Sequence, residues 1–398
     1  MTRVGKLLTV GLVLSACTGG SADPTTTSTE VASTAAETSD SRLLVIDETG
    51  DVVVMNADGD ERVTVAEAGD DGPQFGQPIW SPDGAWVSFA RASQSGFGYV
   101  AHQLDSGASI ETEVDQFPFY ASWSPGGDHV GLLRNGQTDV TFEMLDVVSG
   151  ALRLVDDGTP YYFSWSPVGS DLVAHSGPDR LVTIGVDGVV VDEVETSSSY
   201  LAPTWLAEGF VHVSGDELVV RAQDGSVRPV AVVAETTTFV VSPTGSRVAA
   251  QTFSSNPAIS VALAEVPTLV PNTISVVDLA DGSTTVAWEG IAIAYFWSPD
   301  GQRLLILSLD ESGSSVRASV WSSEGVNDYG NFVPHPTQLR DVYPFFPQYA
   351  QSMSYWSPDS SSFVLVGAIE DEVGVWVQRV GEAEPVLVSA GSWAVWSP

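Results

Sequence analysis

The sequence predicts an all-β fold built from repeated four-stranded antiparallel units. A short signature, Trp-Ser-Pro-Asp-Gly and close variants of it, recurs between residues 42 and 398. Its spacing of about 45 residues is typical of the blades of a β-propeller. Helical periodicity is almost absent, whereas short β-branched runs and Asp-Gly turns are frequent. We therefore expect one β-propeller domain over residues 42–398, with eight blades, or seven if the two weaker units merge.

Each copy of the signature has the composition of a tight turn between two strands. In Trp80-Ser81-Pro82-Asp83-Gly84, proline fixes φ at the second turn position and glycine adopts the positive φ that follows. We expect each tryptophan to end the first strand of a blade and to pack its indole between neighbouring blades. Full copies begin at Trp80, Trp123, Trp165, Trp297, Trp356 and Trp396, and weaker copies lie at Trp205 and Val241.

The two ends of the repeat array predict how the ring closes. The last signature, at Trp396, supplies a first strand and stops three strands short of a full blade. Residues 43–47, 52–56 and 62–66 read as three short strands joined by turns that contain Asp and Gly. Pairing these strands with residues 394–396 would complete one blade and remove the open sheet edge.

The signature series resembles the repeat of TolB-type β-propellers, and the resemblance covers roughly nine tenths of the chain. It implies the propeller fold but no particular activity, because this repeat occurs in translocation proteins, peptidase propellers and bacterial lipoproteins. TolB itself carries an α/β domain ahead of its propeller. Here a short tether takes that place, so the chain is not expected to be TolB.

The N-terminus has the layout of an export signal. Arg3 and Lys6 precede an apolar run over residues 7–14, which is too short to span a membrane. The following Leu14-Ser15-Ala16-Cys17 resembles a bacterial lipobox, and Cys17 is the only cysteine in the sequence. We expect a signal peptide over residues 1–16, lipidation at Cys17, and a disordered Ser/Thr-rich tether over residues 17–41. The protein would then be extracytoplasmic and held at the cell membrane by its lipid alone.

The charge balance limits the class of partner. The sequence has 51 acidic residues against 15 Lys and Arg, a formal net charge of -36. Such a surface repels nucleic acid and anionic lipid. A protein, peptide or glycan at the cell surface is the expected partner, and the protein is expected to be a monomer.

Two long connections point to one face of the propeller as the functional face. The alternation of strands places residues 254–272 and 334–352 opposite the signature turns. Aromatic and acidic side chains gather there, which suits a sugar, a peptide or a basic protein segment. The alternative is that the aromatics plug the channel mouth while the acids face water. The candidate binding residues are Asp71, Asp115, Tyr120, Asp157, Tyr162, Tyr200, His335, Arg340, Tyr343, Phe345, Phe346 and Tyr349.

No sequence motif predicts catalysis. The five histidines are scattered, with no His-Glu-x-x-His pattern, so no zinc site is expected. No Gly-x-Ser-x-Gly elbow is present. We expect no cofactor, with calcium as an option on the acidic rim, and a binding module rather than an enzyme. The alternative function is a hydrolase or lyase that acts on polysaccharide through a pair of rim carboxylates.

Overall fold

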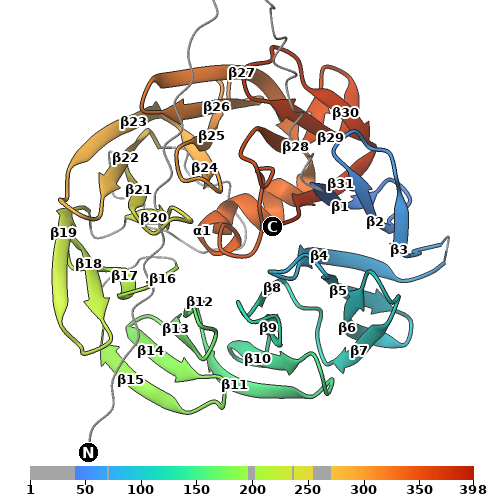
Figure 1. Cartoon of the computed structure of the whole chain (residues 1–398), viewed down its shortest axis with the longest axis horizontal. Helices are drawn as coiled ribbons and strands as arrows, with labels where there is room; N and C mark the ends of the chain where they lie inside the picture. Colours follow the sequence, from blue (N-terminus) through green and yellow to red (C-terminus); the bar gives the residue numbers. More distant parts are fainter. Residues whose placement is uncertain (1–40, 70, 196–201, 235–236, 254–269) are drawn as a thin grey trace, which may run out of the picture. The chain divides into compact units, whose positions relative to one another are not determined.

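The computed structural model describes residues 41–69, 71–195, 202–234, 237–253 and 270–398, which lie in one compact unit, Ser39–Pro398. The described residues form seven antiparallel sheets arranged in a ring (Figure 1). Six sheets have four strands, and the seventh has seven strands. The predicted signal peptide, Cys17, the tether, Tyr200 and most of the connection at residues 254–272 lie outside the described residues.

Blades 1 to 4 each consist of one four-stranded sheet. Blade 1 contains β31 (Gly391–Trp396), β1 (Arg42–Asp47), β2 (Val52–Asn56) and β3 (Val63–Ala66). Blade 2 contains β4 (Gln74–Trp80), β5 (Trp86–Ser93), β6 (Gly96–Gln103) and β7 (Ser109–Val114). Blade 3 contains β8 (Tyr120–Trp123), β9 (His129–Asn135), β10 (Val140–Asp146) and β11 (Leu152–Gly158). Blade 4 contains β12 (Tyr161–Trp165), β13 (Asp171–Ser176), β14 (Arg180–Gly185) and β15 (Val190–Glu195).

Blades 5 to 8 complete the ring. Blade 5 contains β16 (Thr204–Leu206), β17 (Gly209–Ser214), β18 (Glu217–Ala222) and β19 (Val227–Val232). Blade 6 contains β20 (Thr238–Val241), β21 (Arg247–Phe253), β22 (Asn272–Asp278) and β23 (Thr284–Gly290). The seven-stranded sheet holds blade 7, with β24 (Ala292–Trp297), β25 (Leu304–Leu309), β26 (Val316–Ser322) and β27 (Gly325–Pro334), and blade 8, with β28 (Ser362–Ile369), β29 (Glu372–Arg379) and β30 (Val386–Ser389).

The repeat count from the sequence is therefore confirmed at eight blades. The weak units at Trp205 and Val241 form separate sheets and do not merge. Blades 7 and 8 share one sheet because Val333 and Pro334, at the end of β27, pair with Ala368 and Gly367 of β28. The innermost position of blade 8 is supplied by Trp356, which bridges Phe363.

The ring closes as the sequence predicts. β1 pairs antiparallel with β31, with Leu43 opposite Trp396 and Val45 opposite Ala394. Beyond the strand, the Ser397 N–H donates a hydrogen bond to the Arg42 carbonyl at 2.8 Å. Chain segments from the two ends of the described residues thus complete blade 1, and its innermost strand comes from the C-terminus.

The signature tryptophans join neighbouring blades, as expected. The Trp80 indole donates to the Val395 carbonyl of blade 1 at 3.3 Å, and the Trp297 indole donates to the Val240 carbonyl of blade 6 at 3.0 Å. Trp165 and Trp356 likewise donate to backbone carbonyls of the blade before their own, and Trp123 donates to the Ser88 hydroxyl of blade 2. Each of these five indoles therefore satisfies its one donor while its ring is buried in the core between two blades. The indole N–H groups of Trp205 and Trp396 have no hydrogen-bond partner among the described residues.

The sequence predicted almost no helix, but the long connection after β27 forms short helical turns. It contains a π-helical turn η1 (Gln338–Val342), a 3-10 turn η2 (Tyr343–Phe345) and a four-residue helix α1 (Phe346–Tyr349). The helical segment lies inside the ring of blades (Figure 1). Prolines at the second positions of η2 and α1 suit the start of a helical turn, where the N–H has no partner within the helix. Turns this short leave no helical periodicity in the sequence.

Candidate functional site: a groove beside the central plug

Residues 338–351, here called the plug, are fixed to four blades by polar side chains. The Gln348 side chain accepts a hydrogen bond from the Phe163 N–H and donates one to the Phe163 carbonyl, both at 2.8 Å. The Tyr120 hydroxyl donates to the Gln348 carbonyl at 3.0 Å, and the Gln351 amide donates to the Pro203 carbonyl at 3.1 Å. The Tyr349 hydroxyl bonds to groups of blade 2 and of the segment that leads into blade 3. These contacts hold the plug in one position.

The aromatic side chains of the plug were expected on an exposed rim, but most of them are buried. Tyr343, Phe346 and Tyr349 are each no more than 4% exposed. They pack inside the ring of blades because their side chains fill the space between the innermost strands. The centroids of the aromatic rings of Phe346 and Tyr295, for example, lie 4.5 Å apart. Burial raises the pKa values of the Tyr343 and Tyr349 hydroxyls, which stay protonated at neutral pH. For these three residues the structure favours the alternative that aromatics plug the channel.

The remaining predicted site residues do not form one cluster. Tyr120 and Tyr162 are buried in the innermost strands of blades 3 and 4. Phe345 is 37% exposed and His335 is half-buried. Tyr200 lies outside the described residues. Besides Phe345, the exposed members of the set are Asp71, Asp115, Asp157 and Arg340.

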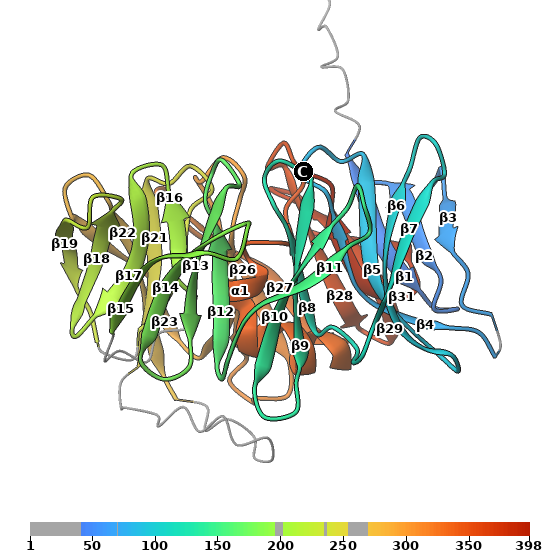
Figure 2. The same cartoon turned by 90° about the horizontal axis from the view of Figure 1, so that it is seen from below.

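A groove opens between blades 1 and 2, beside the plug. It consists of two adjoining cavities of about 420 and 670 Å³, whose linings share Ile46, Gln74, Phe75 and Ser392. The lining comes from strand starts, from connections between second and third strands, and from plug residues. All of these lie opposite the signature turns, so the groove opens on the insertion-bearing face, the face reached by residues 334–352. Figure 2 shows the ring from the side, with the C-terminus at the edge where the signature turns lie.

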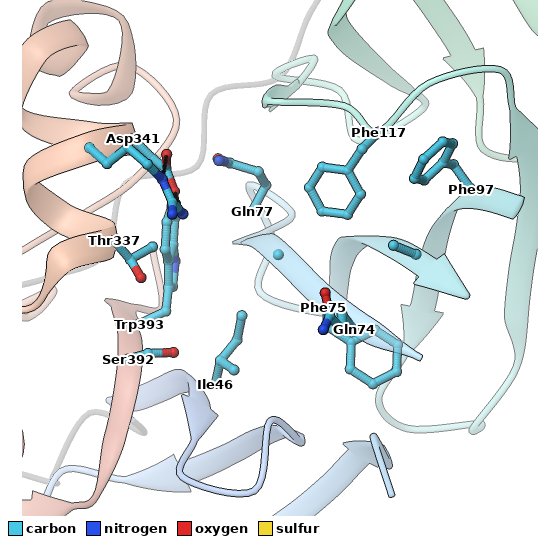
Figure 3. A pocket seen from close by; sticks show the side chains of 13 residues that line it. Ile46, Gln74, Phe75, Gln77, Phe97, Phe117, Thr337, Asp341, Ser392 and Trp393 are labelled. Atoms are coloured by element: carbon cyan, nitrogen blue, oxygen red, sulfur yellow. Dashed lines mark hydrogen bonds and ion pairs between the residues drawn. The ribbon is translucent and has the colours of Figure 1, made fainter. Parts of the chain in front are cut away.

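One wall of the groove belongs to blade 2 and is largely aromatic. Phe75, Phe97 and Phe117 gather on this side of the smaller cavity (Figure 3). The rings of Phe97 and Phe117 meet edge to face, with centroids 6.3 Å apart. A Cβ at position 76 would lie 2.9 Å from the Phe117 ring, so a larger residue there would displace this ring. The absence of a side chain at Gly76 thus lets Phe117 lie against β4.

Gln77 projects from the same strand into the cavity, toward the plug (Figure 3). It has a φ of +55°, which is uncommon for a residue with a side chain. The pairing of β4 with β5 is irregular between Gly76 and Ile79, so Gln77 and Pro78 form a bulge that re-aims the side chain. The Tyr349 hydroxyl lies 3.0 Å from Gln77 Oε1 and holds the amide in place. Strained backbone of this kind is concentrated at functional sites.

The opposite wall comes from the plug and from β31. Arg340 and Asp341 form an ion pair, with Nε and Oδ1 2.6 Å apart, and the pair raises the pKa of the guanidinium. Thr337, Ser392 and Trp393 complete this side (Figure 3). Trp393 is 1% exposed, and its indole N–H has no hydrogen-bond partner among the described residues. A buried donor of this kind needs a partner.

The groove carries little unpaired charge. Asp47, in the larger cavity, is paired with Arg62 at 2.8 Å, and Asp341 is paired with Arg340. Burial and the nearby Arg340 lower the pKa of His335, so this imidazole is neutral at pH 7. Within the described ranges, Glu48 is the lining carboxylate that makes no ion pair, and no group of three metal-ligating side chains is found.

No helix in the described part of the chain is long and apolar enough to cross a membrane.

Sequence reasoning missed most of this groove. Asp341 lies in the long connection, residues 334–352, by which the sequence indicated this face, whereas Gln77 and Trp393 carried no such signal. The proline at position 78, inside a first strand, is the one local hint, because proline in a strand marks an edge or a bulge. Trp393 and Gln77 line the same cavity only because the ring closes.

No protein-family model matches the sequence, and no curated protein matches it. Solved structures do match. An oligogalacturonate lyase in complex with manganese is 14% identical, with 84% of this chain and 95% of that chain covered and a TM-score of 0.52. The β-propeller domain of the Trilobed protease from Pyrococcus furiosus is 12% identical, with coverages of 80% and 95% and a TM-score of 0.50.

TolB from Acinetobacter baumannii also matches, at 13% identity and a TM-score of 0.41. The match covers 72% of this chain, which spans 63% of the length of that TolB. At these identities the two matches with higher TM-scores confirm the β-propeller fold and carry no activity to this chain.

Proposed function

We propose that this protein is a binding module that takes a protein, peptide or glycan ligand in the groove between blades 1 and 2. The groove itself is the observation that carries the proposal. It combines an aromatic wall, a strained and hydrogen-bonded Gln77, and polar groups that make few contacts within the protein. Concave sites with apolar walls and a few converging polar groups are the usual form of ligand sites.

The proposal also covers where in the cell the protein is located. The lipobox-like sequence before Cys17 supports export and lipidation, with the residues that follow as a tether. A lipid-anchored propeller at the cell membrane would meet ligands of the cell surface. The plug supports this role because it holds one wall of the groove in a fixed position.

The alternative of a hydrolase or lyase needs a free acid and a free base on either side of a substrate. Asp341 and Asp47 are each engaged by an arginine. No observation on the described residues singles out a catalytic pair, so binding is the proposed function.

Binding is tested with a fluorescent reporter in the groove. Ser392→Cys, in a Cys17→Ser background, is labelled with a polarity-sensitive dye and titrated with polysaccharide, peptide and protein fractions of the cell surface. We expect a saturable change with at least one fraction. Ser361→Cys, an exposed position after the signature turn of blade 8, is the matched control and should not respond. The proposal is wrong if no fraction changes the groove reporter.

A further inference from the structure

We infer that the ligand of the groove is an uncharged oligosaccharide. This inference rests on the proposed function and names its ligand class. Its basis is the combination, in one cavity, of an aromatic wall and an opposing wall of neutral or mutually paired polar groups (Figure 3).

The charges of the groove disfavour ionic ligands. A basic peptide needs several carboxylates that are free to pair with it, but Asp341 and Asp47 already pair with Arg340 and Arg62. Among the described lining residues this leaves Glu48, in the larger cavity, as the single carboxylate without an ion pair. An acidic ligand would need free cations, would have to displace Asp341 from Arg340, and would approach a chain of net charge -36. A neutral ligand needs neither free carboxylates nor free cations, and it is not repelled by the net charge.

The hydrogen-bonding groups suit a ligand rich in hydroxyls. The Gln74 and Ser392 side chains make no hydrogen bond to the described residues. The Gln77 amide uses one of its two polar atoms on the Tyr349 hydroxyl, and the other makes no hydrogen bond within the part of the chain described. Amides and hydroxyls both donate and accept, as sugar hydroxyls do, so each can bond one edge of a pyranose ring.

The aromatic wall suits the other side of such a ligand. The faces of a pyranose ring carry C–H groups, which pack on the flat faces of aromatic rings, while its edges carry hydroxyls. Phe75 and Phe117 lie across the cavity from Thr337 and Asp341 (Figure 3). An amphipathic ring can therefore contact both walls at once.

The backbone of β4 disfavours an extended peptide. Peptides that bind propeller or sheet edges gain most of their affinity from a regular ladder of main-chain hydrogen bonds. The bulge at Gln77 and Pro78 interrupts such a ladder on the strand that lines the groove, and proline has no N–H to offer.

The test is a calorimetric titration of the full chain with neutral hexasaccharides of glucose, xylose, mannose and N-acetylglucosamine. Hexagalacturonate, hexalysine and an uncharged hexapeptide are titrated in parallel. We expect at least one neutral hexasaccharide to bind saturably, with a Kd that changes less than twofold between 50 and 500 mM NaCl, since no ion pair forms. Phe117→Leu keeps an apolar side chain but removes the ring, so it should weaken that binding at least tenfold. Phe253→Leu, at a half-buried position at the end of β21 in blade 6 and outside the groove, is the matched control and should leave the Kd unchanged.

The outcomes separate this inference from the proposed function. Binding of a peptide or of hexagalacturonate, with no neutral hexasaccharide bound, would overturn the glycan assignment and leave the binding module standing. A hexasaccharide that binds Phe117→Leu as tightly as the wild type would also overturn it. If none of the probes binds, the assignment fails, and the groove reporter at Ser392 decides the proposed function independently.

Discussion

Gln348 and Phe163, 185 residues apart in the sequence, pair as two residues of adjacent strands would. The Gln348 amide both accepts from the Phe163 N–H and donates to the Phe163 carbonyl, at 2.8 Å in each case. A side chain thereby satisfies the free backbone edge of β12, which faces the channel. The plug is therefore fixed by the same kind of hydrogen bonding that holds the blades together.

This relationship predicts the effect of removing the amide. Gln348→Met has a similar length but leaves the Phe163 N–H and carbonyl without partners, which costs about 2 to 4 kcal/mol of unfolding free energy. Urea denaturation measures the change. Gln302→Met, at an exposed glutamine beside a signature turn, is the control and should change stability by less than about 0.5 kcal/mol. A Gln348→Met protein as stable as the wild type would mean that the plug is not fixed through this pair.

His212 predicts a dependence of stability on pH. Burial in β17 lowers its pKa to about 4, with smaller contributions from the charges of Arg221 and His175. The unfolded chain binds a proton near pH 6.5, whereas the folded chain binds it only near pH 4. The stability that His212 contributes is therefore complete above about pH 6.5 and is lost as the pH falls toward 4.

We expect His212→Phe to remove this dependence. The wild type should lose about 3 kcal/mol relative to the variant between pH 7 and pH 4, since one pKa unit corresponds to about 1.4 kcal/mol. The measurement is the difference in unfolding free energy between the two proteins at pH 7, 5.5 and 4. Comparing the two proteins cancels the titration of the many carboxylates they share. Parallel curves for the two proteins would contradict the prediction.

Lipidation predicts a difference in where the protein is found. With intact Cys17, an alkyne-tagged fatty acid fed to the cells should label the protein, and the label should partition with membranes. Cys17→Ser should abolish both the label and the membrane association. Ser15→Thr, a change within the same lipobox-like segment that keeps Cys17, is the control for expression and export. A labelled Cys17→Ser protein would show that the acyl chain is carried elsewhere.

The sequence predicted the features that repeat and missed those that depend on distant contacts. Each signature encodes a turn and a buried indole within a few consecutive residues. The blade count and the pairing of residues 43–47 with 394–396 could therefore be predicted from the repeat pattern alone. Whether Tyr343 or Phe345 is buried depends on how the plug fits a channel formed by all the blades. The groove joins β4 to the start of β31, which are neighbours only in the closed ring. No local pattern carries that information.

The positive φ at Gln77 predicts that a substitution which relieves this strain has opposite effects on the free energy of unfolding and on ligand binding. A side chain at φ of +55° costs on the order of 1 kcal/mol, which glycine does not incur. Gln77→Gly also loses the bond to Tyr349, worth about 1 kcal/mol, so in the wild type the two effects oppose each other. In a Tyr349→Phe background that bond is already absent, and Gln77→Gly should there raise the unfolding free energy by about 1 kcal/mol. Both Gln77→Gly proteins should lose saturation of the dye at Ser392→Cys. If Gln77→Gly destabilises both backgrounds equally, the conformation at Gln77 stores no strain, and the bulge serves packing rather than the ligand.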